Sequence, residues 1–259
     1  MSQENIIHIE NLTKSFGDHL VLKDVSLAIP KGAVTALIGP SASGKSVLLK
    51  CLLGLYPIDS GSVTIEGQNI NRLSRKNKAR MMDRIGVLFQ QNALFDSLTI
   101  WENVCFRPIS NKSLSRKQAY EKAIEILGKV GLKPETALLY PSDLSGGMQK
   151  RVGLARAIAS EADFLILDDP TAGLDPILSL AITNLIQELV KRTNATALVV
   201  TGDMTDLEKR YSHIALLHDK AIQWQGPSND AKTSGHQALL QMLNGDKDGP
   251  IRMKLREAS

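Results

Sequence analysis

The chain has 259 residues, of which 43% are hydrophobic and 22% charged, with a formal charge of +4. This length fits one large domain with a substantial core, and the charge is too small to demand a nucleic acid or another anionic partner. No apolar run approaches the roughly eighteen residues of a membrane span, and we expect no signal peptide. The two cysteines, Cys51 and Cys105, lack partner-like spacing, which indicates free thiols in a reducing compartment.

The first ninety residues are dominated by apolar and β-branched runs that predict strands. The central one, GAVTALI, is the type that lies in the middle of a sheet. The predicted strands cover residues 6–12, 21–29, 32–38, 63–66 and 85–89. A helix is predicted behind GPSASGKS, at residues 39–46, where the third strand ends.

The segment GPSASGKS fits the pattern G-x-x-x-x-G-K-[ST] and lies between a predicted strand and a predicted helix, the context that supports a phosphate-binding loop. Lys45 would reach the β- and γ-phosphates of a nucleotide, and Ser46 would bind Mg²⁺. The alternative is a glycine-rich turn that only begins a helix. The backbone that would cradle the phosphates comprises Gly39, Pro40, Ser41, Ala42, Ser43, Gly44, Lys45, Ser46 and Val47.

A mostly helical section is predicted from about residue 91 to 161. Its helix at 115–130 begins with a capping box formed by Ser115 and Gln118. Further along, LSGGMQKRVGLARAIA at 144–159 places a serine and two glycines before a strongly helical run, which predicts a second phosphate-binding helix start or a simple capped helix. The basic stretch 72–84 is interpreted as a solvated helix face, with an acidic partner or lipid headgroups as the alternative.

The stretch FLILDDPTAGLDP at 164–176 ends an apolar strand in two aspartates. Buried carboxylates are costly without a cation, so Asp168 is expected beside Mg²⁺ and Asp169 is a candidate general base for the attacking water. Asp175 and Pro176 predict the N-cap and first residue of a helix. The expected apolar stripe of that helix comprises Leu178, Ala181, Ile182, Leu185, Ile186 and Leu189. A third buried strand follows at 197–201, and the alternation of strands and helices predicts an α/β fold with a largely parallel sheet.

Together these motifs resemble the nucleotide-binding subunit of an ABC transporter over nearly the whole chain. The Walker A loop, the LSGGM signature at 144–148, the Walker B strand and the GLD turn occur in the order of that family. A narrower resemblance, to the Mla/Mce-associated ATPases of bacterial lipid transporters, rests on VLFQQNALFDSLTIWENV at 87–104, Met148 and LNGDKDGPI at 243–251.

The resemblance implies a P-loop NTPase (RecA-like) core with a mostly parallel sheet, an antiparallel β subdomain and an inserted α-helical subdomain. Residues 1–90 and 162–225 would form the core with the β subdomain, 91–161 the helical subdomain and 226–259 a C-terminal extension. The cofactors implied are ATP and Mg²⁺.

The resemblance also implies roles for single residues. Phe16 would stack on adenine, although a core phenylalanine is the alternative. Gln90 would contact Mg²⁺ and the attacking water. Ser145, Gly146 and Gly147 would close on the γ-phosphate bound by an opposing subunit. Asp175 matches the D-loop and would take part in cofactor binding. One chain would therefore hold half of each site.

Three residues depart from the family pattern. Ala42 and Asp169 stand where glycine and glutamate are usual, and Gly202 stands where the family has a switch histidine. We expect a working but slow ATPase. The alternative is an ATP-binding, nearly inactive regulatory subunit. Spatial replacement of the switch histidine by another of the chain's histidines is not expected; these are His8, His19, His213, His218 and His236.

The implied partners are transmembrane permease subunits, which would dock on the 91–161 section near Gln90, and a second ATP-binding subunit, most simply another copy of this chain. A small accessory subunit could be held by the C-terminal extension, whose amphipathic piece HQALLQMLNG could instead pack on its own domain. The implied location is the cytoplasmic face of a bacterial inner membrane. The narrower resemblance implies that the subunit powers phospholipid transport, and the alternative is an importer or exporter ATPase for a different substrate.

Overall fold

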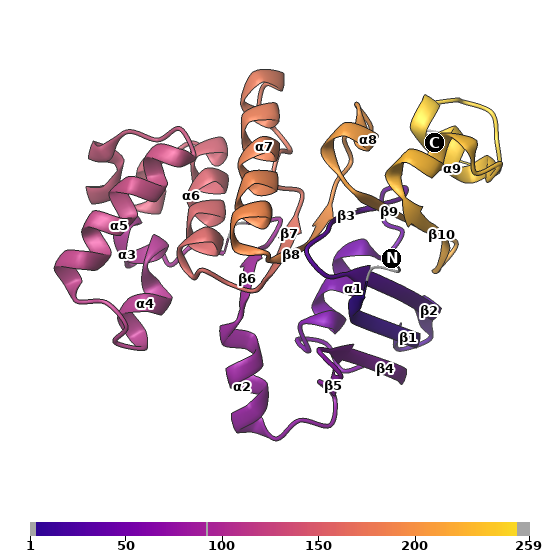
Figure 1. Cartoon of the computed structure of the whole chain (residues 1–259), viewed down its shortest axis with the longest axis horizontal. Helices are drawn as coiled ribbons and strands as arrows, with labels where there is room; N and C mark the ends of the chain where they lie inside the picture. The colour runs from indigo at the N-terminus through magenta and orange to yellow at the C-terminus, as the bar shows by residue number, and fades with distance from the viewer. Residues whose placement is uncertain (1–3, 92, 253–259) are drawn as a thin grey trace.

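A computed structural model of the chain describes residues 4–91 and 93–252, and Figure 1 shows their arrangement. One sheet is antiparallel and four-stranded, in the order β2 (His19–Pro30), β1 (Asn5–Phe16), β4 (Ser60–Ile65) and β5 (Gln68–Asn69). Strands β1 and β2 alternate between buried and more exposed side chains, as expected for a sheet that covers a core with one face.

The second sheet has six strands and carries the predicted phosphate-binding loop. In the order of the sheet they are β10 (Ala221–Pro227), β9 (His213–His218), β3 (Val34–Ile38), β8 (Thr196–Val200), β7 (Phe164–Asp168) and β6 (Ile85–Leu88). All neighbours are parallel except β10, which pairs antiparallel with β9. Every residue of β3, β7 and β8 is buried, because helices or the first sheet cover both faces.

Helices α3 to α6 gather at one end of the molecule, and the four-stranded sheet lies toward the other (Figure 1). We call α3 to α6 and the 3-10 turns among them the helical region. The α-helices are α1 (Lys45–Leu52), α2 (Arg75–Asp83), α3 (Ile100–Val104), α4 (Phe106–Ser110), α5 (Arg116–Lys129), α6 (Gly146–Ala159), α7 (Pro176–Thr193), α8 (Leu207–Arg210) and α9 (Gln237–Asn244). The 3-10 turns are η1 (Pro134–Leu138), η2 (Pro141–Asp143) and η3 (Ser228–Thr233).

Two hydrophobic cores lie on opposite faces of the six-stranded sheet. One joins that sheet to α1 and the four-stranded sheet, through residues such as Leu37, Leu48 and Ile9. The other joins it to α7 and the helical region, through residues such as Val199, Ile186 and Leu154. The carboxyl ends of the parallel strands are thereby fixed from both sides, which is where an α/β sheet places its ligand site.

The predicted α/β fold class is confirmed, and the predicted strands and the helices beginning at Ser115 and Asp175 are present. Strand β1 is longer than predicted and runs on to Phe16. The hairpin of β9 and β10 was not predicted. Helix α9, within the predicted C-terminal extension, packs Ala238 and Leu239 into the core of this same chain, and residues 253–259 of that extension lie outside the described residues.

The predicted apolar stripe of α7 is wrong at one position. Ala181 is exposed, whereas Ser179 and Thr183 are buried. The Thr183 hydroxyl donates to the carbonyl oxygen of Ser179 at 2.9 Å, so its polar group is satisfied inside the helix. The buried face is therefore rotated toward these two small polar residues, which a count of apolar positions does not reveal.

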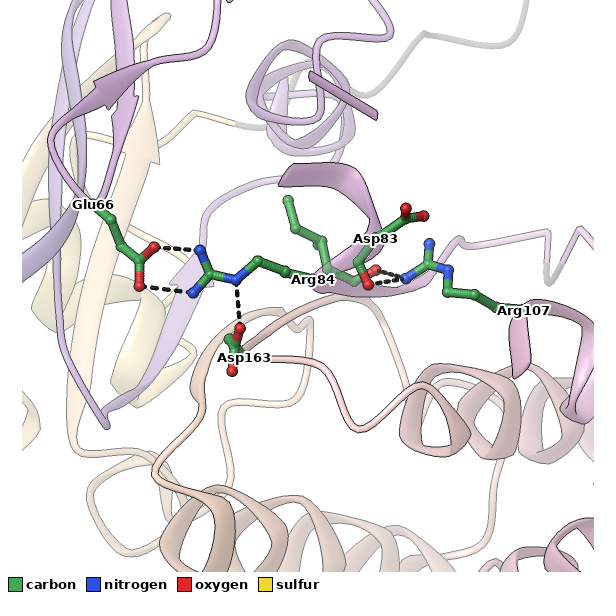
Figure 2. A network of polar contacts seen from close by, with 6 residues as sticks. Glu66, Asp83, Arg84, Arg107 and Asp163 are labelled. Carbon is green, nitrogen blue, oxygen red and sulfur yellow. Dashed lines mark hydrogen bonds and ion pairs between the residues drawn. The ribbon is translucent and has the colours of Figure 1, made fainter. Parts of the chain in front are cut away.

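The junction between α2 and β6 is held by a network of charged groups (Figure 2). Arg84 forms a bidentate ion pair with Glu66, at the turn after β4, and its Nε donates to Asp163, the residue before β7, at 2.6 Å. Arg84 binds one carboxylate bidentately and a second at the same time. Its ion pairs therefore stabilise the fold more than an isolated surface pair would. The network fixes the start of β6 against both sheets.

Cys51 and Cys105 are both buried and free, in agreement with the sequence. Burial raises the pKa of each thiol to about 11. Within residues 4–91 and 93–252, no helix combines the length and apolar character needed to cross a bilayer.

Candidate functional site

The loop between β3 and α1 is a cradle that side chains leave open. Gly39 has φ 151° and Gly44 has φ 102°. A Cβ at Gly39 would lie 2.1 Å from the carbonyl oxygen of Leu217, and one at Gly44 would lie 2.9 Å from Cδ2 of Leu22. Helix α1 then begins at Lys45 with no side chain capping its N-terminus and no acidic residue in its first turn. The local geometry therefore requires glycine at both positions and suits an anion at the helix start.

Lys45 holds its ammonium group beneath this loop. Its Nζ donates to the carbonyl oxygens of Gly39 at 2.8 Å and Pro40 at 2.7 Å. Burial lowers the pKa of Lys45, whereas the nearby carboxylates of Asp169 and Asp168 act in the opposite direction. The ammonium group is thus partly desolvated beside two carboxylates, and a phosphate in the cradle would give it a direct partner.

Asp168 ends β7 and is 6% exposed. Burial raises the pKa of its carboxyl, and a hydrogen bond with the Ser46 hydroxyl and the charge of Lys45 oppose that shift. Burial destabilises the charged form of this carboxylate. A bound cation would offset that desolvation cost, so the site is suited to a cation. Ser46 lies beside it, as the sequence predicts for two Mg²⁺ ligands.

A single cavity of about 340 Å³ brings most of the predicted site together. We call it the nucleotide cavity. Gln90, which follows the end of β6, lines it together with the loop and both aspartates. Its lining residues are Val21, Ser41, Ala42, Ser43, Gly44, Lys45, Ser46, Val47, Gln90, Asp168, Asp169 and Val200. Val21 and Val200 were not predicted, because an apolar side chain in a strand carries no signal of a ligand.

Asp169 also borders a second cavity, of about 460 Å³, which we call the switch cavity. Gly202 lines it and donates its backbone N–H to Oδ1 of Asp169 at 3.4 Å. Asp203 and Arg210, which form an ion pair with each other, lie on the same wall. Within the described part of the chain, none of the five histidines lines either cavity.

Asp169 itself adopts a left-handed conformation with φ 58°, and its N–H donates to the carbonyl oxygen of Val200 at 3.0 Å. Aspartate tolerates this region better than residues with longer side chains, because its short carboxylate bonds locally. The turn therefore presents the carboxylate between the two cavities.

Phe16 lies at the end of β1 and is 44% exposed. Its ring packs edge-to-face on Tyr56, with centroids 5.2 Å apart, and the Lys14 ammonium lies 5.1 Å from its centroid. The alternative of a core phenylalanine is therefore wrong. An exposed ring near β2, whose Val21 lines the nucleotide cavity, remains available for stacking.

The signature residues lie apart from this cavity. Ser145 caps α6 by accepting from the N–H of Met148 at 3.3 Å, and Ser145 and Gly146 are exposed. A Cβ at Gly146 would meet no atom within 4 Å. Asp175 caps α7 by accepting from the N–H of Leu178 at 3.0 Å. Neither Asp175 nor the signature lines the nucleotide cavity, so within one chain these residues cannot act on a phosphate held there.

These residues fit a magnesium nucleotide. The cradle is open because two glycines lack a Cβ, Lys45 supplies a cation, and Ser46 with Asp168 supplies oxygen ligands of the kind that Mg²⁺ prefers. Among the described residues, no group of three or more His, Cys, Asp or Glu side chains is placed to hold a metal ion. This arrangement suits Mg²⁺, which takes one or two protein ligands and the phosphates of its nucleotide.

Replacing Ala42 with glycine is expected to stabilise the chain by about 0.5–1 kcal/mol. Ala42 has φ 60°, and a left-handed alanine costs about 1–2 kcal/mol, part of which glycine loses again through its freer unfolded chain. Chemical denaturation of the two variants measures the difference. Ala181→Gly, on the exposed face of α7, is the control and should destabilise by about 1 kcal/mol. Equal destabilisation by both variants would contradict the argument from strain at Ala42.

Replacing Asp168 with asparagine is expected to raise the melting temperature of the nucleotide-free chain at pH 8 by about 2–4 °C, which corresponds to about 1 kcal/mol. The buried carboxylate is destabilised in its charged form, and the amide has no charge to desolvate. The same variant should lose the Mg²⁺-dependent part of its stabilisation by ATP. Calorimetry with and without Mg·ATP measures both effects, and a variant less stable than the parent without nucleotide would contradict this account.

Comparison with known proteins adds three findings. A family model described as ABC transporter matches residues 22–172. The intermembrane phospholipid transport system ATP-binding protein MlaF of Haemophilus influenzae is 35% identical over 97% of this chain and 95% of its own length. The histidine/lysine/arginine/ornithine transport ATP-binding protein HisP of Salmonella typhimurium is 38% identical over 87% of this chain and 91% of its own length.

Among solved structures, a dimeric post-hydrolysis state of the ATP-binding cassette MJ0796 bound to ADP and Pi superposes with a TM-score of 0.80. It is 31% identical and covers 86% of this chain and 99% of its own. The fold is therefore that of an ATP-binding cassette, and this structural relative is a dimer bound to ADP and Pi.

Proposed function

The chain belongs to the ABC transporter family and is an ATP-binding, ATP-hydrolysing subunit, and from this premise we propose that it powers phospholipid transport at a bacterial inner membrane. The observation that carries the proposal is the nucleotide cavity, which brings Lys45, Asp168 and Gln90 together at the carboxyl end of the parallel sheet. The relative named for phospholipid transport supports the substrate class, because the match covers 97% of this chain.

Each residue of the cavity would act on a different part of the reaction. Lys45 would neutralise charge on the β- and γ-phosphates, while Ser46, Asp168 and Gln90 would hold Mg²⁺, which draws charge from the phosphate oxygens. Asp169 would orient and deprotonate the attacking water. Phe16 would stack on the adenine ring.

Two chains would be needed for each reaction. Ser145, Gly146 and Gly147 do not line the nucleotide cavity of their own chain, so we propose that they close on the γ-phosphate bound by a second copy. Asp175 would lie at the same contact between the two copies. The dimeric structural relative bound to ADP and Pi supports this arrangement.

A permease partner would dock beside Gln90. Beyond Gln90 along the chain, Phe95 packs on Phe106 of the helical region: the two rings are 43% and 40% exposed and their centroids are 4.5 Å apart. Leu139, in the helical region, is 38% exposed, and its carbonyl oxygen accepts from the N–H of Ile100 at 2.9 Å. An exposed apolar cluster of this kind is suited to a protein partner.

The chain would accordingly be peripheral, on the cytoplasmic face of the membrane. We also propose that a small accessory subunit binds to residues 226–259. The buried face of α9 is already used within this chain, so such a partner would have to bind the exposed residues around it.

The transport proposal is tested by assembling the chain with its permease in phospholipid vesicles and measuring ATP-dependent movement of a labelled phospholipid. The expected result is transfer that requires Lys45 and is not inhibited by excess histidine or arginine. Stimulation of ATP hydrolysis by basic amino acids, with no lipid transfer, would instead favour an amino-acid transporter, the role named for the HisP relative.

A second candidate function is regulatory: the chain would bind ATP and dimerise but hardly hydrolyse it. The observation that favours it is the pair of departures around the switch cavity, the shortened carboxylate of Asp169 and the missing side chain of Gly202. Tight Mg·ATP binding with turnover no higher than that of Lys45→Ala would support this alternative.

A further inference from the structure

Gln90 is carried by a short segment whose two ends are held by arginines from the helical region. The segment begins at Asp83, continues through β6 and passes Gln90 to Ala93. The amino end is clamped by Arg107 of α4, whose NH1 donates to the carbonyl oxygens of Asp83 and Ile85, each at 2.9 Å. Figure 2 shows Arg107 reaching the backbone on one side of the junction while Arg84 points to Glu66 and Asp163 on the other.

The other end is held by Arg156 of α6. Its NH1 donates to the carbonyl oxygen of Ala93 at 2.7 Å. Ala93 is in a left-handed conformation with φ 48°, so the backbone turns at the point where the arginine binds it. A charge-assisted hydrogen bond of this length is among the stronger contacts a backbone carbonyl can make. Arg156 therefore fixes the chain three residues beyond Gln90.

Helix α6 also packs directly on β6. A Cβ at Gly86 would lie 2.5 Å from the carbonyl oxygen of Ala157, so only glycine permits this approach of helix to strand. Arg156 is half-buried; burial lowers its pKa, and the charge of Arg107 nearby acts in the same direction. The bond from its guanidinium to Ala93 joins the helix to the Gln90 segment.

The same helix begins at the signature. Ser145 is the N-cap of α6, and Arg156 lies eleven positions further, about 16 Å along a helix that rises about 1.5 Å per residue. A continuous 14-residue helix transmits a displacement at one end to the other, because its backbone hydrogen bonds resist bending. The signature and the Gln90 segment are thus attached to one rigid element.

We propose that Arg156 is a positioning residue that ties Gln90 to the signature helix, so that the Gln90 segment at one ATP site and the signature serving the other site shift together. This inference rests on the proposed function, in which Gln90 contacts Mg²⁺ and the attacking water and the signature closes on the nucleotide of a second copy. Arg156 does not line the nucleotide cavity, and its bond to the backbone at Ala93 is the contact through which it would position Gln90.

The test is a double-variant cycle on the transporter assembled with its permease. Arg156→Gln should lower kcat about 10-fold and leave the Kd for Mg·ATP within about twofold, because the cradle is intact and a misplacement of about 1 Å costs up to about 100-fold in rate. In a Gln90→Ala background the same substitution should change kcat less than about twofold, since Arg156 would then have nothing to position.

Arg151→Gln is the matched control. Arg151 lies on the same helix and its NH1 donates to the carbonyl oxygen of Gly131 at 2.8 Å, away from the Gln90 segment. It should lower the melting temperature as much as Arg156→Gln does, with kcat altered by less than about twofold in either background. If Arg156→Gln lowers kcat by the same factor with and without Gln90, the positioning role is overturned.

Hydrogen exchange separates this inference from the proposed function. Amides of residues 86–91 should exchange several-fold faster in nucleotide-free Arg156→Gln than in the parent or in Arg151→Gln, a result that needs no turnover. Unchanged exchange overturns the positioning role even where the transporter hydrolyses ATP. Faster exchange in a complex without Lys45-dependent hydrolysis upholds it while the proposed function fails. If Arg156→Gln does not fold, Arg156→Lys, which keeps the charge, is measured in the same way.

Discussion

Replacing Lys45 with alanine is expected to reduce Mg·ATP hydrolysis by the assembled transporter to background. The Lys45 ammonium is the cation at the base of the cradle, where it donates to oxygens of Gly39, Pro40 and Ser43. Each hydrogen bond to a charged group contributes about 1.5–3 kcal/mol, and charge on the transferred phosphoryl group is stabilised more strongly in the transition state than in the ground state. We therefore expect kcat to fall at least about 100-fold and ATP affinity to weaken about tenfold or more.

Lys50→Ala is a suitable control, because Lys50 lies on the same helix, contacts Tyr56 and does not line the nucleotide cavity. Phosphate release measured at saturating Mg·ATP should be near that of the parent for Lys50→Ala and at background for Lys45→Ala. If Lys45→Ala keeps a third or more of the parental turnover, the nucleotide cavity is not where hydrolysis occurs.

The largest gain of activity is expected from the double variant Asp169→Glu, Gly202→His. Asp169 is shorter than glutamate by one carbon–carbon bond, about 1.5 Å, and a misplacement of about 1 Å costs up to about 100-fold. A contact to the γ-phosphate of the kind an imidazole would supply is worth about 2.7–4 kcal/mol by analogy with an oxyanion donor. The two effects act on one water and one phosphate and are not additive, so we expect kcat to rise about 100-fold or more.

The switch cavity can accept the new side chain. A Cβ at Gly202 would meet no atom within 4 Å, and the adjoining space is about 460 Å³. Glutamate at position 169 must adopt the left-handed conformation found for Asp169, at a cost of about 1 kcal/mol, so melting temperatures should be measured alongside the rates. The two single variants complete the series. A double variant whose kcat stays within threefold of the parent would show that these positions do not limit the rate.

Local patterns along the chain were enough to predict most of the nucleotide cavity. The loop from Gly39 to Ser46 is contiguous in sequence, and Asp168 and Asp169 end a recognisable buried strand, so their meeting follows from the rule that strand carboxyl ends share one edge of a parallel sheet. Gln90 came from the family resemblance, because a single glutamine after a strand has no distinguishing pattern.

Other features depend on tertiary contacts that leave little trace in the sequence. The bond of Arg156 is to a backbone carbonyl, and every residue carries one of those. The burial of Ser179 and Thr183 in α7 follows from a hydroxyl bonding within the helix, which an apolar stripe misses. Strand β9 of the β9–β10 hairpin pairs with β3 of the parallel sheet. The composition of the hairpin does not predict this long-range contact.

The burial of both native thiols has a practical consequence for labelling chemistry. Cys51 and Cys105 are fully covered and their pKa values are near 11, so at neutral pH almost none of either is the thiolate that alkylating reagents attack. Cysteines introduced at exposed positions such as Ser41 and Ser145 would be modified selectively without first mutating the native pair. A bifunctional maleimide could then join these two positions between two copies that keep both native cysteines. The cross-link would form when the two copies close around ATP.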